Sequence, residues 1–334
     1  MRRFVLITSV VMSACATVHV DVPVMKPAEI NMGRYKQIAV GELRGQHGQE
    51  IMNLVQQHLM ESNRFQVVDR AHLGQIMGEL KLSASELADP NHAAQLGKQL
   101  PASALLFGNV EEDDFQNNET FEDRKVADAK GNTHVQRYYT RVGTATVRVS
   151  FQIDDVETGQ LLKVKRVEKR AQQRRFNDCA QYSNAECHAP SIDGSEMLRQ
   201  EREEVVAEFM RAIVPHRVVQ EASFYKDGDL PELERAIAMC KLGEWAKAQD
   251  LVSTAIDRGE KSGLASKIIA KAYWDRGLVY EYSGQYDKAK ADVQKAYEYT
   301  SDDDFLKELA HIEQAATDAK KLQEQNATAG VSGS

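Results

Sequence analysis

The sequence predicts an α+β protein, in which an α/β sandwich-type domain with a long antiparallel hairpin precedes an all-α domain. Three observations support this prediction. Short apolar runs alternate with segments of helical periodicity up to residue 108. Apolar and polar residues then alternate strictly over residues 145–153, as in a half-buried strand. From residue 230 to residue 316 only the helical period is found.

The first domain is predicted to span residues 32–214. Its strands are the apolar runs 35–41, 65–69 and 104–108, and its helices lie between them, with apolar residues at three- and four-residue spacing. The alternating strand 145–153 reaches a turn at Glu157-Thr158-Gly159-Gln160, and residues 161–170 return as its partner. A helix with inward apolar residues between 198 and 213 closes the domain.

The amino terminus is typical of an exported lipoprotein. Arg2 and Arg3 precede an apolar run, residues 4–12, that is too short for a membrane-spanning helix and suits a signal peptide. Met12-Ser13-Ala14-Cys15 resembles the lipobox of bacterial lipoproteins, in which the cysteine thiol is lipidated; an ordinary secretory signal is the alternative. We expect residues 1–15 to form the signal peptide with its lipobox, Cys15 to carry the membrane anchor, palmitate included, and residues 16–31 to be a tether. Ala16 replaces the usual Asp retention signal, which predicts an outer-membrane location facing the periplasm.

The net charge and the spacing of the cysteines limit which partners and which sites this protein can have. A net charge of −8 argues against nucleic acid as a partner. Cys179 and Cys187 bracket a polar loop, and in an exported protein this pattern favours a disulfide. A metal site that adds His188 is the alternative, although it lacks close C-x2-C spacing and a fourth ligand. Cys240 lies in an amphipathic helical pattern, which predicts a buried apolar role.

The order of several short motifs resembles a known family. Phe65-Gln66-Val67-Val68-Asp69-Arg70 precedes a helix with Leu73, Ile76 and Glu79; Ala94-Gln95-Leu96-Gly97-Lys98, Leu106-Phe107-Gly108 and Asp155-Val156-Glu157-Thr158-Gly159 follow. Over residues 36–214 this order resembles the curli-secretion (CsgG-like) lipoproteins. That set includes flagellar lipoproteins, lipoprotein activators of peptidoglycan synthases and the amino-terminal domain of the Tol-system translocation protein.

The resemblance implies that a secretion pore must be considered. In the curli pore, two hairpin extensions from each subunit enter the membrane, and the corresponding segments here are 111–141 and 163–195. Lipid-facing strands carry apolar residues at every second position, whereas these segments are rich in Glu, Asp, Lys and Arg. Because each Arg or Lys costs on the order of 2–4 kcal/mol at mid-bilayer, we expect these hairpins to stay in the periplasm.

The second domain, residues 230–316 after a linker at 215–229, contains two copies of one pattern. The pattern resembles the tetratricopeptide repeat, in which small residues let two antiparallel helices approach and an aromatic fills the gap between them. The candidate repeat-packing residues are Gly243, Trp245, Ala248 and Ala255 in the first copy, and Gly277, Tyr280, Gly284, Tyr286, Ala289 and Ala296 in the second. Such repeats bind peptides or helices on a concave face, although a small helical domain without a binding role is also compatible. Residues 317–334 are predicted to be a disordered tail.

The sequence contains no recognised catalytic or cofactor-binding motif. Residues 41–48 lie where phosphate loops lie but lack the Walker and Rossmann spacings, and no histidine pair or nucleophile motif occurs. We therefore expect no catalytic residue, no metal and no cofactor. The sequence predicts a non-catalytic adaptor or assembly factor of a cell-envelope machine for secretion, flagella or peptidoglycan synthesis. It would bind envelope proteins through the helical repeats and the membrane through its anchor. The alternative is a homo-oligomeric subunit of a ring-shaped, curli-like export channel.

Overall fold

The computed structural model describes residues 17–80, 95–96, 98–101, 103–127, 130–178, 187–301 and 303–328. The chain folds into two compact units. The sheet unit consists of residues 28–214 and 325–334, and the helical unit consists of residues 1–27 and 215–324. The α+β fold class is therefore as predicted. Within the described residues, no helix is both long enough and apolar enough to cross a membrane.

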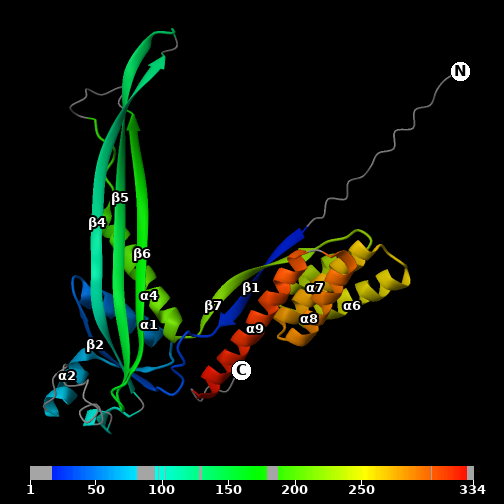
Figure 1. The fold of residues 1–334 in the computed structure, drawn as a ribbon, viewed down its shortest axis with the longest axis horizontal. Helices are drawn as coiled ribbons and strands as arrows, with labels where there is room; N and C mark the ends of the chain where they lie inside the picture. The colour runs from blue at the N-terminus through cyan, green and yellow to red at the C-terminus, as the bar shows by residue number, and fades with distance from the viewer. Residues whose placement is uncertain are drawn as a thin grey trace. The chain divides into compact units, whose positions relative to one another are not determined.

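The sheet unit is built on five strands in the order β3-β2-β4-β5-β6. β2 is parallel to both of its neighbours, β3 and β4, while β4, β5 and β6 are antiparallel to one another in sequence. The last three strands are much longer than the others, as Figure 1 shows. The strands are β2 (Gln37–Arg44), β3 (Gln66–Val68), β4 (Ser103–Ala127), β5 (Thr133–Asp155) and β6 (Leu161–Asp178).

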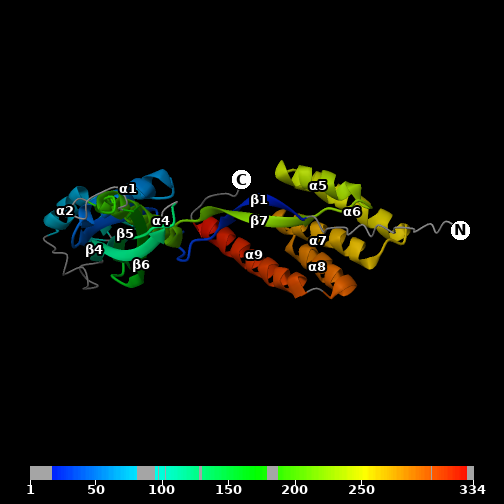
Figure 2. The same cartoon turned by 90° about the horizontal axis from the view of Figure 1, so that it is seen from above.

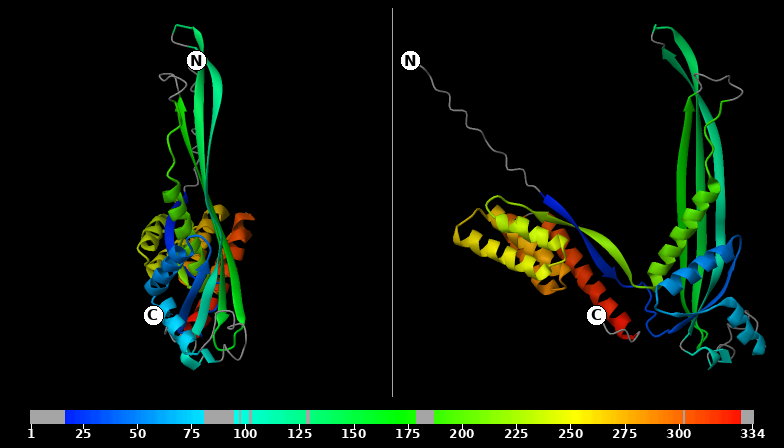
Figure 3. Two further views of the ribbon diagram at one scale, coloured as in Figure 1. Left: turned by 90° about the vertical axis from the view of Figure 1, so that its left-hand side faces the viewer. Right: turned by 180° about the vertical axis from the view of Figure 1, so that it is seen from behind.

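Helices cover both faces of the sheet near its parallel end. Helices α1 (Gly48–Glu61) and α4 (Gly194–Ile213) bury their apolar residues against one face. There Phe209 of α4 stacks on Phe151 of β5, with ring centroids 4.1 Å apart. Helix α2 (Arg70–Glu79) packs on the other face, where Leu73 joins a smaller core. The long strands continue past the N-terminal end of α4, which Figure 3 shows from two further sides.

The predicted hairpin is present as β5 and β6, and its alternating apolar residues 145–153 are all buried. β4 is longer than predicted, because its charged residues 111–125 continue the strand rather than leaving it. These charges are paired across the strands: Arg148 Nη1 lies 2.7 Å from Glu112, Arg141 Nη2 lies 2.9 Å from Glu119, and Arg137 Nε lies 2.6 Å from Asp123. Cross-strand pairs of opposite charge stabilise a sheet whose faces are solvated.

The helical unit contains two helical hairpins, one further helix and a two-stranded ribbon (Figure 2). Its core joins the apolar faces of these elements, and the ribbon is antiparallel. The hairpins are α5 (Pro231–Lys241) with α6 (Trp245–Lys261), and α7 (Ser266–Tyr282) with α8 (Tyr286–Thr300). Helix α9 (Asp303–Thr328) follows, and the ribbon consists of β1 (Thr17–Lys26) and β7 (His216–Tyr225).

The ribbon corrects two predicted boundaries. The predicted tether 16–31 contains β1, and the predicted linker 215–229 contains β7, whose residues pair in register from Thr17 with Tyr225 to Lys26 with His216. Val20 and Phe224 are buried in the helical core. Valine occurs at every second position from 18 to 24, which gives β1 one apolar face. This segment is therefore a structural strand of the helical unit.

The predicted disordered tail also needs correction, because α9 continues to Thr328. Gln325 is buried, and its side-chain amide donates to the Ala28 carbonyl at 2.9 Å and accepts from the Ala28 N–H at 3.1 Å. Alanine, lysine, glutamine and glutamate dominate residues 313–325, and all four favour helix. Residues 329–334 lie outside the described part of the chain.

Candidate functional site

The two helical hairpins have the same turn. Gly243 and Gly284 adopt φ values of +74° and +78°, a left-handed conformation that favours glycine. The Gly243 N–H donates to the Cys240 carbonyl and the Glu244 N–H to the Met239 carbonyl, both at 3.0 Å. Forty-one residues later, Gly284 and Gln285 make the same two bonds to Glu281 and Tyr280. The repeated sequence pattern therefore corresponds to a repeated backbone structure.

The small residues of the pattern lie where the helices meet. Ala248, Ala255, Ala289 and Ala296 are fully buried. Gly277 of α7 faces Val293 of α8 so closely that a Cβ atom on Gly277 would lie 2.6 Å from a Val293 methyl carbon. The aromatic positions are half-buried: Trp245 stacks on Tyr282 with centroids 5.8 Å apart, and Tyr280 and Tyr286 contact the same core.

One face of the second hairpin combines aromatic rings and cations. Arg276 lies between two rings of α7, 5.3 Å from the centroid of Tyr273 and 5.8 Å from that of Tyr280. Its guanidinium forms a bidentate pair with Asp292 of α8, at 2.6 and 2.9 Å. The face is completed by Lys288, Lys295 and Tyr299, with each lysine near a tyrosine ring and Tyr273 stacked on Tyr299. We call Tyr273, Arg276, Tyr280, Lys288, Lys295 and Tyr299 the aromatic-cationic face.

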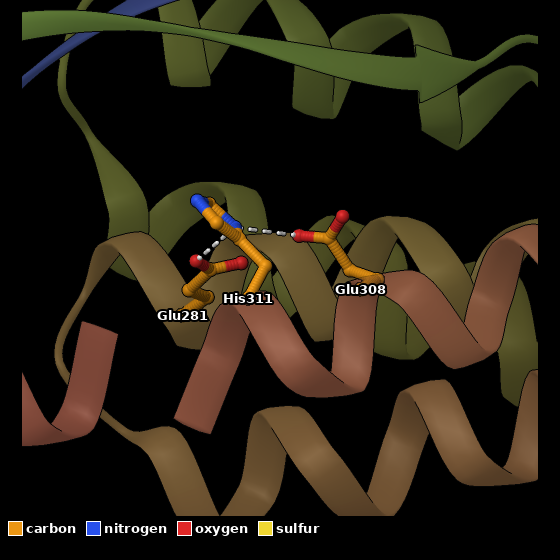
Figure 4. Close-up of side chains that lie close together, drawn as sticks. All are labelled: Glu281, Glu308 and His311. Carbon is orange, nitrogen blue, oxygen red and sulfur yellow. Dashed lines mark hydrogen bonds and ion pairs between the residues drawn. The ribbon is translucent and has the colours of Figure 1, made fainter. Parts of the chain in front are cut away.

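Three titratable side chains meet between α7 and α9 (Figure 4). His311 Nδ1 lies 3.1 Å from Glu281 Oε1 and 3.3 Å from Glu308 Oε1. The Glu281 side chain is 2% exposed, and among the described residues neither of its oxygens has a partner in hydrogen-bond geometry. Burial raises the pKa of Glu281 to about 7, while the two carboxylates, Glu281 foremost, raise the pKa of His311 to about 10.

Sequence analysis does not find this cluster. Glu308 and His311 are three residues apart, a spacing that places two side chains on one helix face. That spacing is the one feature of the sequence that could indicate the cluster. Glu281 comes from another helix, and no local sequence pattern predicts that α7 packs on α9.

A second buried carboxyl group lies in α7. Asp275 is 1% exposed; its Oδ1 accepts from the Tyr225 N–H at 2.8 Å, and its Oδ2 has no hydrogen-bond partner among the described residues. Burial raises the pKa of Asp275 well above its ordinary value. The bond to Tyr225 fixes β7 to the helical core, so Asp275 has a structural role.

The sheet unit has a buried ion pair. Arg202 of α4 donates to both oxygens of Asp113 in β4, at 2.8 and 3.0 Å, and to Glu50 of α1 at 2.9 Å. The Asp113 side chain is completely buried. This network joins α1 and α4 to the sheet where β4 begins to extend.

The structure describes two of the four cysteines, Cys187 and Cys240. Cys15 and Cys179 lie outside the described residues, so lipidation and the Cys179–Cys187 disulfide stay predictions. Cys187 is buried, with the Asn177 Nδ2 atom 3.6 Å from its sulfur. Cys240 is buried in the helical core, and burial raises the pKa of its thiol to about 12, which makes it an inert packing residue.

The fold of the sheet unit can now be compared with known families. Residues 28–180 match the family model described as curli production assembly/transport component CsgG. This region is a CsgG-like domain. The match covers β2 through β6, including the long strands, and ends before α4. The CsgG-like domain therefore accounts for most of the sheet unit, whereas the helical hairpins lie outside the match.

Solved structures give a weaker comparison. The PelC dodecamer from Paraburkholderia phytofirmans is 13% identical, with 60% of this chain and all of that chain covered, at a TM-score of 0.26. The LpoB C-terminal domain from Salmonella enterica is 11% identical (40% and 83% covered, TM-score 0.25). Lipoprotein GNA1162 from Neisseria meningitidis is 13% identical (52% and 96% covered, TM-score 0.26). No curated protein matches the sequence significantly.

Proposed function

We propose that this chain is a lipoprotein of the outer membrane, facing the periplasm, that acts as a non-catalytic adaptor or assembly factor of a cell-envelope machine. The observation that carries the proposal is a CsgG-like domain, residues 28–180, behind a lipobox-like sequence that ends at Cys15. The domain would dock on or oligomerise within the machine, and the helical hairpins would recruit a protein partner.

The anchor is tested by replacing its acceptor thiol. In a Gram-negative host, the full chain should incorporate labelled palmitate and sediment with membranes, and Cys15→Ser should abolish both. Cys240→Ala is the matched control, because Cys240 is buried and should not change labelling. Palmitate incorporation that persists in Cys15→Ser would show that the anchor has been assigned to the wrong residue.

The aromatic-cationic face supports a partner with acidic side chains. Tyrosine and arginine are enriched at interaction hot spots, and tyrosine buries a large area with little loss of side-chain freedom. Lys288 and Lys295 are exposed beside the tyrosines of this face, where they would favour carboxylates on a partner. The proposed partner is therefore an acidic segment of an envelope protein.

Charge reversal tests this interaction without disturbing the core. Lys288→Glu/Lys295→Glu should remove at least one envelope protein that crosslinks to the wild-type chain in cells. The control Lys247→Glu/Lys267→Glu makes the same change at two exposed lysines outside the aromatic-cationic face, and it should keep that crosslink. Identical crosslinked proteins in all three chains would exclude this face as the recruiting surface.

A ring-forming subunit is the second candidate, and one observation favours it. β6 is the last strand in the order of the five-stranded sheet, and it is 18 residues long. An edge strand of this length offers backbone groups to a neighbouring copy. Its lysines and arginines oppose such pairing, which is why we place the adaptor role first.

A further inference from the structure

The Glu281–Glu308–His311 cluster has the donor set of a transition-metal site. Imidazole nitrogen and carboxylate oxygen bind Zn²⁺ at about 2.0–2.2 Å, in a tetrahedral arrangement whose donor atoms are therefore about 3.3–3.6 Å apart. The distances from His311 Nδ1 to the two carboxylate oxygens are 3.1 and 3.3 Å. One ring nitrogen faces both carboxylates, and the donor atoms of the three residues lie within 4.8 Å of one another. An ion can therefore contact all three donors after small side-chain movements.

Glu281 provides an independent indication of a ligand. It is buried and points into the cluster (Figure 4). Its Oε1 atom has only the ion pair with His311 at 3.1 Å, and its Oε2 atom has no hydrogen-bond partner among the described residues. A buried carboxylate oxygen without a hydrogen bond loses the solvation that water would give it. A bound cation would satisfy these oxygens directly.

The charges of the cluster balance with a divalent ion. Two carboxylates and a neutral imidazole carry a charge of −2 in total, which Zn²⁺ neutralises. In the absence of a metal, a protonated His311 leaves the same group of side chains with one uncompensated negative charge when both carboxylates are ionised. Metal binding would therefore replace the His311 proton with a larger positive charge at the same position.

Gln220 of β7 supplies the outer contact that metal-binding histidines require. Its Nε2 atom lies 3.1 Å from His311 Nε2, on the opposite side of the ring from the carboxylates. Which of the two groups donates in this contact depends on the tautomer of His311. If Nδ1 binds a metal, Nε2 carries the proton and donates to the Gln220 oxygen after rotation of the amide. Such a partner fixes the orientation of the ring.

We propose that Glu281, Glu308 and His311 bind one Zn²⁺ ion in the helical unit, with a fourth position open to water or to a side chain of a bound partner. Three protein ligands and an open position are typical of zinc sites that act on or bind a further group. The proposal is independent of the adaptor role, because it concerns only these three residues and a metal ion.

The test is titration of the metal-free full chain with Zn²⁺ by calorimetry, after removal of metals with a chelator. We expect one ion per chain and release of protons on binding, measured in two buffers of different ionisation enthalpy, because His311 must lose its proton. Co²⁺ in place of Zn²⁺ should give the strong visible absorption of a tetrahedral site. His311→Gln and Glu308→Gln should each weaken Zn²⁺ binding at least tenfold.

His58→Gln is the matched control. His58 also lies beside two glutamates, but different ring nitrogens face them, Nδ1 toward Glu61 and Nε2 toward Glu203, each at 3.6 Å. That arrangement cannot hold one ion between the three side chains, so His58→Gln should bind Zn²⁺ as the wild type does. His311 is partly exposed, and His311→Gln is expected to fold. The proposal is overturned if no one-to-one binding occurs, or if His311→Gln binds Zn²⁺ as tightly as His58→Gln.

Discussion

The contact between Gly277 and Val293 gives a sharp test of how the second hairpin packs. Alanine at a helix-interior glycine stabilises by about 1 kcal/mol through propensity. At Gly277 the new Cβ would lie 2.6 Å from a Val293 methyl carbon, and overpacking of this kind costs about 1–3 kcal/mol. We therefore expect Gly277→Ala to lower the free energy of unfolding by up to about 2 kcal/mol.

Gly259→Ala provides the comparison within the same unit. Gly259 also lies inside a helix, but its added Cβ would meet carbon atoms at 3.6 Å, which is ordinary contact. This variant should raise the free energy of unfolding by about 0.5–1 kcal/mol. The two substitutions are chemically identical, so opposite signs can only come from the space around each glycine.

Urea unfolding followed by tryptophan fluorescence is the assay, because Trp245 and Trp274 both lie in the helical unit. A double-mutant cycle with Val293→Ala isolates the contact. Removing the valine methyls alone should cost about 2 kcal/mol, and in the presence of Gly277→Ala it should cost at least about 1 kcal/mol less. Additive free energies in the cycle, or a stabilising Gly277→Ala, would refute this description of the hairpin.

Two further predictions concern buried charges. Arg202→Met removes the bidentate partner of the fully buried Asp113, which keeps only His47 Nδ1 at 3.3 Å, and should destabilise the sheet unit by about 3 kcal/mol. Arg202→Met/Asp113→Leu should recover most of that loss in thermal unfolding followed by circular dichroism. Recovery that fails in the double variant would count against the ion pair as the cause. Asp275 has a raised pKa in the folded chain, so its contribution to stability is full below its unfolded pKa of about 3.9 and is lost as the pH rises through the folded value. Asp275→Asn keeps an acceptor for the Tyr225 N–H and should remove this dependence, which unfolding measured from pH 4 to pH 9 would detect; an unchanged pH profile would contradict it.

Local sequence patterns predict the elements whose contacts join residues that are close in sequence. The β5–β6 hairpin follows from strict alternation and a four-residue turn, and the hairpin repeats follow from a glycine two residues before an aromatic. β4 extends beyond the predicted strand 104–108 because several of its charged residues meet opposite charges on the neighbouring strand, as Asp123 meets Arg137 of β5.

Long-range pairing explains the other differences. β1 pairs with β7, about 200 residues later, so the valines of β1 gave no local sign of their partner. Glu281 and His311 come together through the packing of two helices, a contact that no short motif records. The lipidation and disulfide predictions depend on residues outside the described chain and rest on the sequence alone.

The native mass of the lipid-free chain, residues 16–334, tests the central claim most directly. Light scattering after size exclusion measures it without reference to shape. The adaptor role predicts a monomer or a dimer, with partner recruitment through the helical hairpins. A closed ring of many subunits would contradict this account and would assign the long β4–β6 sheet to a ring-shaped export channel.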